Sequence, residues 1–194
     1  MEEMMDAMQS KAGQRAYVQK LRRAMTERER AEKSRLLCFN LLSLPELERA
    51  RVILSYMPTA EEADVEAANG ALGQMGKILC FPVTSENAFM SAFQPRSGDA
   101  FERRRYGIRE PLTACSREIP PEEIDLVIVP CVAFDANLMR LGHGAGYYDR
   151  FLPLCKKAIK IAAAFELQRL EKVICDERDI PMDAVVTEKE IYRK

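Results

Sequence analysis

The part of this chain with the clearest chemical potential is the ten-residue segment Arg140–Asp149, which reads Arg-Leu-Gly-His-Gly-Ala-Gly-Tyr-Tyr-Asp. Its alternating glycines leave main-chain N–H groups unobstructed, and a helix that starts directly after them favours a bound anion. Arg140 adds a fixed positive charge, and Asp149 offers a carboxylate of the kind that holds a divalent metal ion. These residue types in this spacing predict a site for a phosphate chain with its magnesium.

The glycine spacing alone is a weak signal. No Gly-Lys-Ser/Thr follows it, as a P-loop requires, and it matches no dinucleotide fingerprint. A loop whose glycines only permit tight turns would read the same way. An arginine, three glycines, two tyrosines and an aspartate within ten residues favour a binding site over that alternative.

The elements that must position this segment alternate between strands and helices. Asp125–Pro130 is the clearest strand, because it is apolar without alternation, as in a parallel strand covered on both faces. The segment Arg140–Asp149 follows this strand, and ligands of open α/β sheets bind at the carboxyl ends of strands. Further strands are expected over residues 51–56, 77–81, 88–93, 159–164 and 184–186. Helices are expected over residues 11–43 in two pieces, 64–75, 146–157 and 166–173.

Local signals place several boundaries. Thr26 and Glu29 match a capping box, which predicts a new helix start near residue 27. Pro45 is expected to end that helix. Pro82 is expected to end the strand over residues 77–81. Residues 95–121 are rich in proline and glycine, and predict an irregular excursion over one end of the sheet. The alternation predicts one α/β domain over residues 1–194, with three αβα layers, a largely parallel central sheet and N-terminal helices.

Composition excludes several classes of protein. With 29 Lys+Arg against 30 Asp+Glu, the chain lacks the strong positive charge of a dedicated nucleic-acid binder. Its longest apolar stretch, Leu126–Phe134, is far short of the ~18 residues that a membrane span needs. The acidic N-terminus is unlike a signal peptide, and the six cysteines match no metal or disulfide pattern. We therefore expect a cytoplasmic protein with reduced cysteines, and no nucleic-acid or membrane partner.

The segment Arg140–Asp149 resembles the signature of the 5-formyltetrahydrofolate cyclo-ligases, also called 5,10-methenyltetrahydrofolate synthetases. The resemblance runs in order over nearly the whole chain. The other matching positions are Lys11, Arg15, Lys20–Arg22, Glu62, Asp64, Asp125–Pro130, Phe134–Asp135 and Asp179–Asp183. It implies a fold similar to NagB/RpiA/CoA transferase-like proteins, and a monomer whose partners are small molecules. It also implies ATP- and Mg²⁺-dependent conversion of 5-formyltetrahydrofolate to 5,10-methenyltetrahydrofolate, with release of ADP and phosphate.

The resemblance also implies roles for individual residues. The ATP site would comprise Lys11, Arg15, Arg140, Leu141, Gly142, His143, Gly144, Ala145, Gly146, Tyr147 and Tyr148. The folate site would comprise Met57, Glu62, His143, Gly144, Ala145, Gly146 and Tyr147. Asp149 and Asp179 would bind magnesium, and the catalytic residues would be Arg140, His143 and Tyr147. His143 is not expected to act as a general base.

Each role has a simpler alternative. Lys11 and Arg15 would also fit a solvated basic helix face, Glu62 a surface acid, Met57 a core position and Asp179 a turn. Residues 11–35 hold nine Lys/Arg against three Asp/Glu, and residues 171–190 hold seven Asp/Glu against three Lys/Arg. A basic helix suits phosphates and an acidic segment suits their magnesium. The predicted site therefore requires these two ends of the chain to meet at the segment Arg140–Asp149.

The chain departs from the family pattern at a few positions. Leu138 stands where glycine is usual, Ala145 where a glycine or basic residue is usual, and Val65, Val83 and Gln14 differ as well. These differences leave open a non-catalytic relative that binds folate or nucleotide. A sugar-phosphate isomerase or acyl-transfer enzyme of similar architecture is disfavoured, because no carboxylate base or nucleophile stands out beside the loop.

Overall fold

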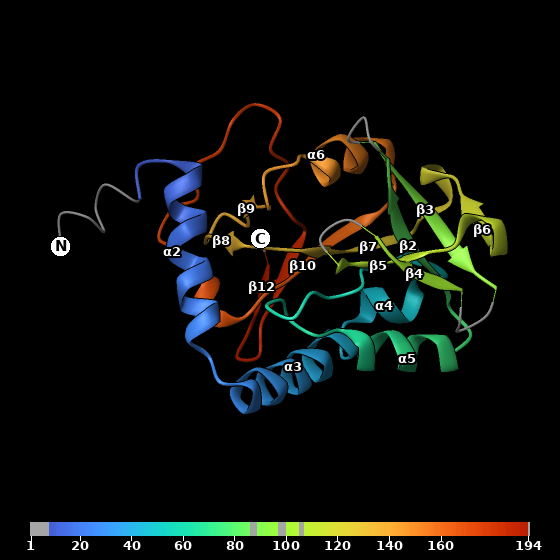
Figure 1. Ribbon diagram of the computed structural model, residues 1–194, viewed down its shortest axis with the longest axis horizontal. Coiled ribbons are helices and arrows are strands. Elements are labelled where there is room, and N and C mark those ends of the chain that lie inside the picture. Colours follow the sequence, from blue (N-terminus) through green and yellow to red (C-terminus); the bar gives the residue numbers. More distant parts are fainter. Residues whose placement is uncertain (1–7, 86–88, 97–99, 105–106, 194) are drawn as a thin grey trace.

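The computed structural model describes residues 8–85, 89–96, 100–104 and 107–193, and its centre is an eight-stranded mixed sheet (Figure 1). The strand order is β12-β11-β10-β7-β1-β2-β3-β6. The parallel part contains β11 (Ala184–Val186), β10 (Ile159–Ala163), β7 (Leu126–Pro130), β1 (Val52–Leu54) and β2 (Ile78–Thr84). The antiparallel edges are β12 (Ile191–Arg193), β3 (Met90–Pro95) and β6 (Ser116–Ile119). The expected α/β fold with a largely parallel sheet is confirmed.

The central strand β7 is buried on both faces. Leu126 and Ile128 pack into one hydrophobic cluster, and the alternating Val127 and Val129 pack into another on the opposite face. The first face is covered by α3 (Glu27–Leu42), α4 (Pro45–Arg49) and α5 (Glu66–Gln74), and the second by α6 (Tyr147–Phe151) (Figure 1). Burial on both faces explains why the strand is apolar at every position.

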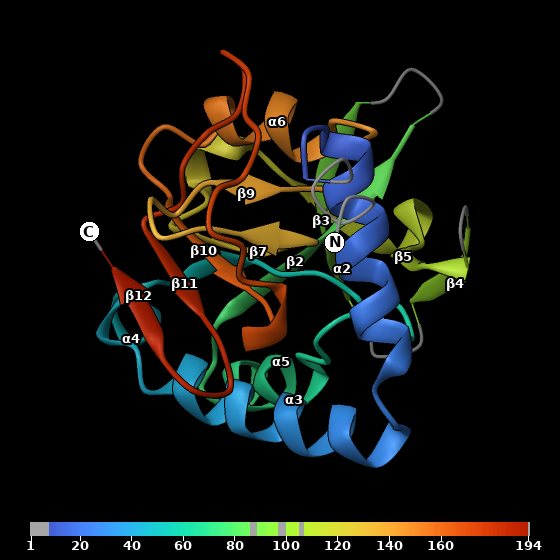
Figure 2. The same ribbon diagram turned by 90° about the vertical axis from the view of Figure 1, so that its left-hand side faces the viewer.

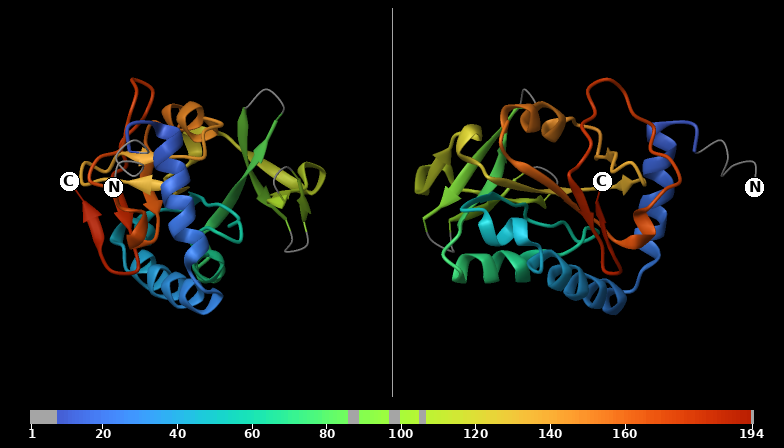
Figure 3. Two further views of the ribbon diagram at one scale, coloured as in Figure 1. Left: turned by 60° about the vertical axis from the view of Figure 1, so that its left-hand side comes forward. Right: turned by 180° about the vertical axis from the view of Figure 1, so that it is seen from behind.

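The first described helix, α2 (Lys11–Ala24), crosses the end of the sheet where the parallel strands finish (Figure 2). Its Val18 packs against Val132, Ala133 and Leu141, which lie just beyond β7. Figures 1 and 3 place α2 at one end of the molecule and β3 and β6 at the other. The capping box between Thr26 and Glu29 is present, so the expected two-piece helix is confirmed. Within the described residues, no helix combines the length and apolar character that a membrane crossing requires.

Pro82 does not close its strand, contrary to the prediction. β2 continues to Thr84, and Pro82 pairs with Ala92 in antiparallel register with β3. On its other side β2 pairs with β1 only as far as Cys80. Pro82 stands beyond that last parallel pair, so the sheet does not need an N–H at this position to donate to a carbonyl of β1.

The segment 95–121 is also more regular than predicted. β4 (Phe101–Arg103) and β5 (Arg109–Pro111) form an antiparallel pair, β6 joins the main sheet, and short 3₁₀ turns lie at Thr113–Cys115 and Pro121–Glu123. Gly107 lies in the turn between β4 and β5, whereas Pro95 and Pro111 are the last residues of β3 and β5. Strand pairing therefore orders a segment whose composition predicts irregular structure. The expected strand at 88–93 is β3, and its residue 88 lies outside the described residues.

Two predicted helices are shorter than expected. The helix over 146–157 is reduced to α6 and a 3₁₀ turn at Leu152–Leu154, because Pro153 has no N–H for a continuing helix. The helical piece near 166–173 is only a 3₁₀ turn at Glu166–Gln168. Pro45 opens α4 at its first position, where the missing N–H has no partner to lose.

Candidate active site

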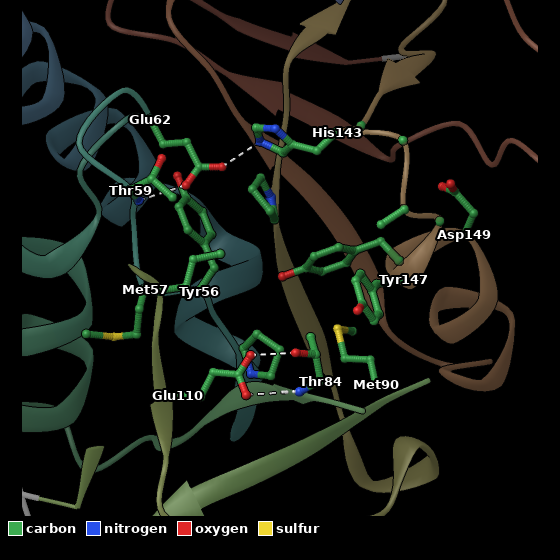
Figure 4. A pocket seen from close by; sticks show the side chains of 18 of the residues that line it. Tyr56, Met57, Thr59, Glu62, Thr84, Met90, Glu110, His143, Tyr147 and Asp149 are labelled. Carbon is green, nitrogen blue, oxygen red and sulfur yellow. Dashed lines mark hydrogen bonds and ion pairs between the residues drawn. The ribbon is translucent and has the colours of Figure 1, made fainter. Parts of the chain in front are cut away.

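A cavity of about 550 Å³ lies beside the carboxyl ends of β1 and β7 (Figure 4). Three parts of the chain line it. One wall is the segment after β1 with Tyr56, Met57, Thr59 and Glu62. The second wall runs from Arg140 to Asp149 without Leu141, and its residues 142–146 are called the glycine loop below. The third wall contains Pro82, Thr84, Met90, Ile108 and Glu110. Pro130, at the end of β7, completes the lining.

The glycine loop leaves β9 (Arg140–Leu141), which pairs with β8 (Ala133–Phe134). Gly144 and Gly146 have φ angles of 104° and 71°, in the left-handed region that favours glycine. Gly142 needs its small size instead, because a Cβ there would lie 2.8 Å from a terminal nitrogen of Arg140. The expected anion-binding helix start is weak, since α6 has only five residues to contribute a dipole.

Three guanidinium groups surround this loop. Arg15 Nε donates to the carbonyl of Gly142 at 2.7 Å, and Arg150 donates to the carbonyl of Ala145 at 2.6 Å. Cβ atoms built on Gly144 and Gly146 would lie 3.3 Å from Arg15 Cζ and 2.9 Å from an Arg150 nitrogen. The absence of side chains at these glycines lets cations approach the loop closely. Arg150 was not among the predicted site residues.

Arg140 is the most confined of these cations. Only 5% of the residue is exposed, and its Nη2 donates to Asp149 Oδ1 at 2.5 Å. Its Nη1 donates to the carbonyl of Pro130 at 3.3 Å, and its Cζ lies 5.7 Å from the centre of the Tyr148 ring. Asp149 and the Pro130 carbonyl at the end of β7 therefore hold the guanidinium in one place at the cavity wall.

The basic and acidic ends of the chain meet beside this loop. Lys11 Nζ donates to Asp176 at 2.8 Å and to Asp179 at 2.5 Å. Burial on its own lowers the pKa of Lys11, but these hydrogen bonds outweigh it and raise the pKa above its usual value. The structure thus pairs Asp179 with Lys11 and Asp149 with Arg140. The described residues hold no group of three or more His, Cys, Asp or Glu side chains placed to bind a metal.

Glu62 lies buried on the opposite wall of the cavity. Its Oε1 is 2.9 Å from Nε2 of His143, and its Oε2 accepts from the Thr59 N–H at 2.8 Å (Figure 4). Burial on its own raises the pKa of the Glu62 carboxyl, but the hydrogen bonds from His143 and Thr59 outweigh it and hold the pKa below its usual value. Met57, predicted to touch a ring, lines the same cavity.

Several lining residues escaped the sequence reasoning. Glu110 is only 3% exposed, and it accepts hydrogen bonds from the N–H of Thr84 at 3.1 Å and its hydroxyl at 2.7 Å. A single glutamate between an arginine and a proline carries no recognisable pattern, and it lies in the segment predicted to be irregular. The pairing of β5 and β2 with other strands brings Glu110 to the cavity, so no local signal could have found it.

The comparisons with known proteins agree over most of the chain. The model of the 5-formyltetrahydrofolate cyclo-ligase family matches residues 7–188. The 5-formyltetrahydrofolate cyclo-ligase of Escherichia coli (strain K12) is 28% identical over 181 residues, which cover 90% of this chain and 98% of that relative. A probable 5-formyltetrahydrofolate cyclo-ligase of Schizosaccharomyces pombe is 31% identical over 173 residues, covering 81% and 84%.

Solved structures agree with this assignment. The NMR structure of Aquifex aeolicus 5,10-methenyltetrahydrofolate synthetase has a TM-score of 0.83 and 34% identity, and the match covers 94% of this chain and 92% of that one. A 5,10-methenyltetrahydrofolate synthetase from Mycoplasma pneumoniae has a TM-score of 0.76 at 21% identity, covering 92% and 99%, which supports the fold. The chain therefore belongs to the 5-formyltetrahydrofolate cyclo-ligase family, and it is an enzyme of the ligase class.

Proposed function

We propose that this protein uses ATP and Mg²⁺ to convert 5-formyltetrahydrofolate to 5,10-methenyltetrahydrofolate, releasing ADP and phosphate. The observation that carries the proposal is the cavity of about 550 Å³, which has a cation-lined glycine loop on one wall and the buried carboxylate of Glu62 on another. The loop suits a phosphate chain, and the cavity suits a ring with a hydrogen-bond donor edge. We further propose a monomer whose partners are these small molecules.

The reaction explains why both parts are needed. A formamide is a poor electrophile, and transfer of the γ-phosphoryl group to its oxygen converts that oxygen into a leaving group. The N10 amine of the same folate then attacks the formyl carbon, the phosphate leaves and N10 loses its proton. Ring closure is intramolecular, so holding the folate in a folded pose supplies much of the rate.

Phosphoryl transfer depends on positioning and on neutralising charge. Arg15 lies against the glycine loop from outside and Arg140 from the cavity wall, so both are placed to neutralise phosphate oxygens. Lys11, already paired with Asp176 and Asp179, would orient that acidic segment as well as contact phosphate. No strong base is required in this scheme, so His143, whose Nε2 lies 2.9 Å from Glu62, needs no proton-transfer role.

A magnesium ion at this site would need only a few ligands from the protein. Mg²⁺ commonly binds one or two carboxylates and takes its other ligands from substrate phosphates and water. Asp149 lines the cavity with 29% of its side chain exposed, so it would hold the ion, and Asp179 would join from the segment beside Lys11. The bound ion would supply charge neutralisation on the phosphates.

Glu62 and Met57 would hold the folate ring. The Glu62 carboxylate would accept hydrogen bonds from the pterin donor edge, and Met57 would pack on the ring face. Tyr147 lines the cavity and is directed into it from the glycine-loop side (Figure 4), so it would contact the reacting end of such a ligand.

The test of this proposal is direct. Purified protein is mixed with 5-formyltetrahydrofolate, ATP and Mg²⁺, and formation of the methenyl product is followed by its absorbance. The expected result is a signal that requires both ATP and Mg²⁺. Binding of 5-formyltetrahydrofolate without any product would contradict the proposal and support the non-catalytic alternative.

A further inference from the structure

The hydroxyl group of Tyr148 is an anomaly in the cavity wall. Tyr148 lines the cavity, but its hydroxyl oxygen is buried and has no hydrogen-bond partner among the described residues. Tyr56 lines the same cavity and gives the opposite case, because its buried hydroxyl donates to the carbonyl of Ala63 at 2.8 Å. Buried hydroxyl groups nearly always find a partner, since leaving one unpaired costs folding free energy.

The surroundings of this hydroxyl indicate what kind of partner it lacks. Burial raises the pKa of Tyr148 well above its usual value, so at neutral pH the group is a protonated donor. The neighbouring Arg140 also has a buried Nε for which the described part of the chain offers no partner, although its terminal nitrogens form hydrogen bonds. Two adjacent side chains therefore each retain an unused donor, and an acceptor oxygen is what such donors require.

The position of Tyr148 favours the folate over the nucleotide. Its ring packs against the hydrophobic core cluster that contains Cys80 of β2 and Met90 of β3, on the sheet side of the cavity. Arg15 and Arg150 donate instead to the carbonyl groups of Gly142 and Ala145 in the glycine loop, and Tyr148 makes neither contact. A neutral hydroxyl group suits a carbonyl oxygen, whereas the charged oxygens of a phosphate are matched by guanidinium groups.

We propose that the Tyr148 hydroxyl donates a hydrogen bond to a carbonyl oxygen of the bound folate, either the formyl oxygen or the pterin ring carbonyl. The proposal rests on the function proposed above. It assigns to folate recognition a residue that the family resemblance placed in the nucleotide site. The free protein then carries an unsatisfied donor, and the substrate supplies its partner.

The substitutions Tyr148→Phe and Tyr56→Phe form a matched pair, since each removes one hydroxyl from the same cavity. Thermal unfolding of Tyr148→Phe is expected at the wild-type temperature or slightly above it, because no protein hydrogen bond is lost. Tyr56→Phe is expected to unfold at a lower temperature, because the Ala63 carbonyl loses its donor. A similar loss in Tyr148→Phe would overturn the proposal, since its hydroxyl would then have a protein partner.

Binding is measured by calorimetry on the full-length protein. For Tyr148→Phe, the Kd of 5-formyltetrahydrofolate is expected to rise about 5-fold, as for the loss of one hydrogen bond, with the Kd of ATP unchanged. An unchanged folate Kd, or a change confined to ATP, overturns the proposal. 5-Methyltetrahydrofolate, which has no formyl oxygen, distinguishes the two acceptors. A penalty that disappears with this ligand assigns the formyl oxygen, and a penalty that persists assigns the ring carbonyl.

The wild-type protein separates this inference from the proposed function. If it binds 5-formyltetrahydrofolate but forms no methenyl product, the catalytic proposal fails while the Tyr148 comparison still decides the inference. If it turns over the folate and Tyr148→Phe binds that folate equally well, only the inference fails. If it binds neither folate, both fail.

Discussion

His143 and Glu62 lie 2.9 Å apart, Nε2 to Oε1, although 81 residues separate them in the sequence. The contact joins the glycine loop to the segment after β1 across the cavity (Figure 4). Because both residues line the cavity, a ligand that bonds to Glu62 must share or replace this contact. The loop that is proposed to hold phosphates and the carboxylate that is proposed to hold folate are therefore in direct contact before either ligand binds.

This contact predicts a pH dependence of folding stability. The Glu62 pKa lies below its unfolded value of 4.5, so the folded protein binds fewer protons at this group than the unfolded chain. The stability it contributes is fully present above about pH 4.5 and is lost as the pH falls through the lower folded pKa. The difference in unfolding free energy between wild type and Glu62→Gln should therefore shrink between about pH 7 and about pH 3 in urea titrations. Glu123→Gln, at an exposed position, is the control, and an equal difference at both pH values would contradict the prediction.

The pair of Arg140 and Asp149 predicts a large effect on turnover. Arg140→Ala and Asp149→Ala should each lower kcat by about 100-fold or more, because each removes charge from the proposed phosphoryl-transfer site. Arg35→Ala is the matched control. It removes an exposed ion pair with Glu32 on α3, and such pairs contribute little to folding stability. The methenyl absorbance assay checks all three variants, and a wild-type rate in either site variant would refute the site assignment.

The substitution Gly142→Ala is predicted to reduce activity only because of the size of the added methyl group. A methyl group there would meet the Arg140 guanidinium at 2.8 Å, so Gly142→Ala should displace Arg140 from Asp149 and reduce kcat by about 10-fold or more. Gly70→Ala is the control, because it lies on α5 with nothing within 4 Å of the new methyl group. That variant should retain full activity and gain up to about 1 kcal/mol in stability. Equal activities of the two variants would disprove the steric argument.

At Leu138, a glycine variant is predicted to be more stable than an alanine variant. Its φ angle is 62°, and its side chain is 1% exposed, so the position combines a left-handed backbone with a buried apolar group. Leu138→Ala loses the buried side chain and retains the strain, whereas Leu138→Gly loses the side chain and relieves about 1 kcal/mol of strain. Both variants should be destabilised by about 2 kcal/mol or more, with the glycine variant the more stable of the two. Denaturant unfolding measures this order, and a more stable alanine variant would contradict it.

Local patterns account for much of what could be predicted about this protein. The capping box at Thr26 and Glu29, the apolar run of β7 and the left-handed glycines each act through neighbours close in sequence, so their types reveal the structure. The predictions at Pro82 and in the segment 95–121 failed for the converse reason. There, pairing between strands, of β2 with β3, β4 with β5 and β3 with β6, overrides the local preference of proline and glycine.

By itself, the sequence determined the α/β class and the family, and it predicted a loop suited to phosphate. Only the tertiary structure decided which groups face one another. Glu62 with His143, Lys11 with Asp176 and Asp179, and Glu110 at the cavity wall all depend on how strands far apart in the chain are ordered in the sheet. The Tyr148 hydroxyl, which has no hydrogen-bond partner among the described residues, belongs to the same group, because only the folded structure shows which groups surround it. Residue types and short spacings indicate which chemical groups are present, whereas the order of strands in the sheet determines which of these groups contact one another.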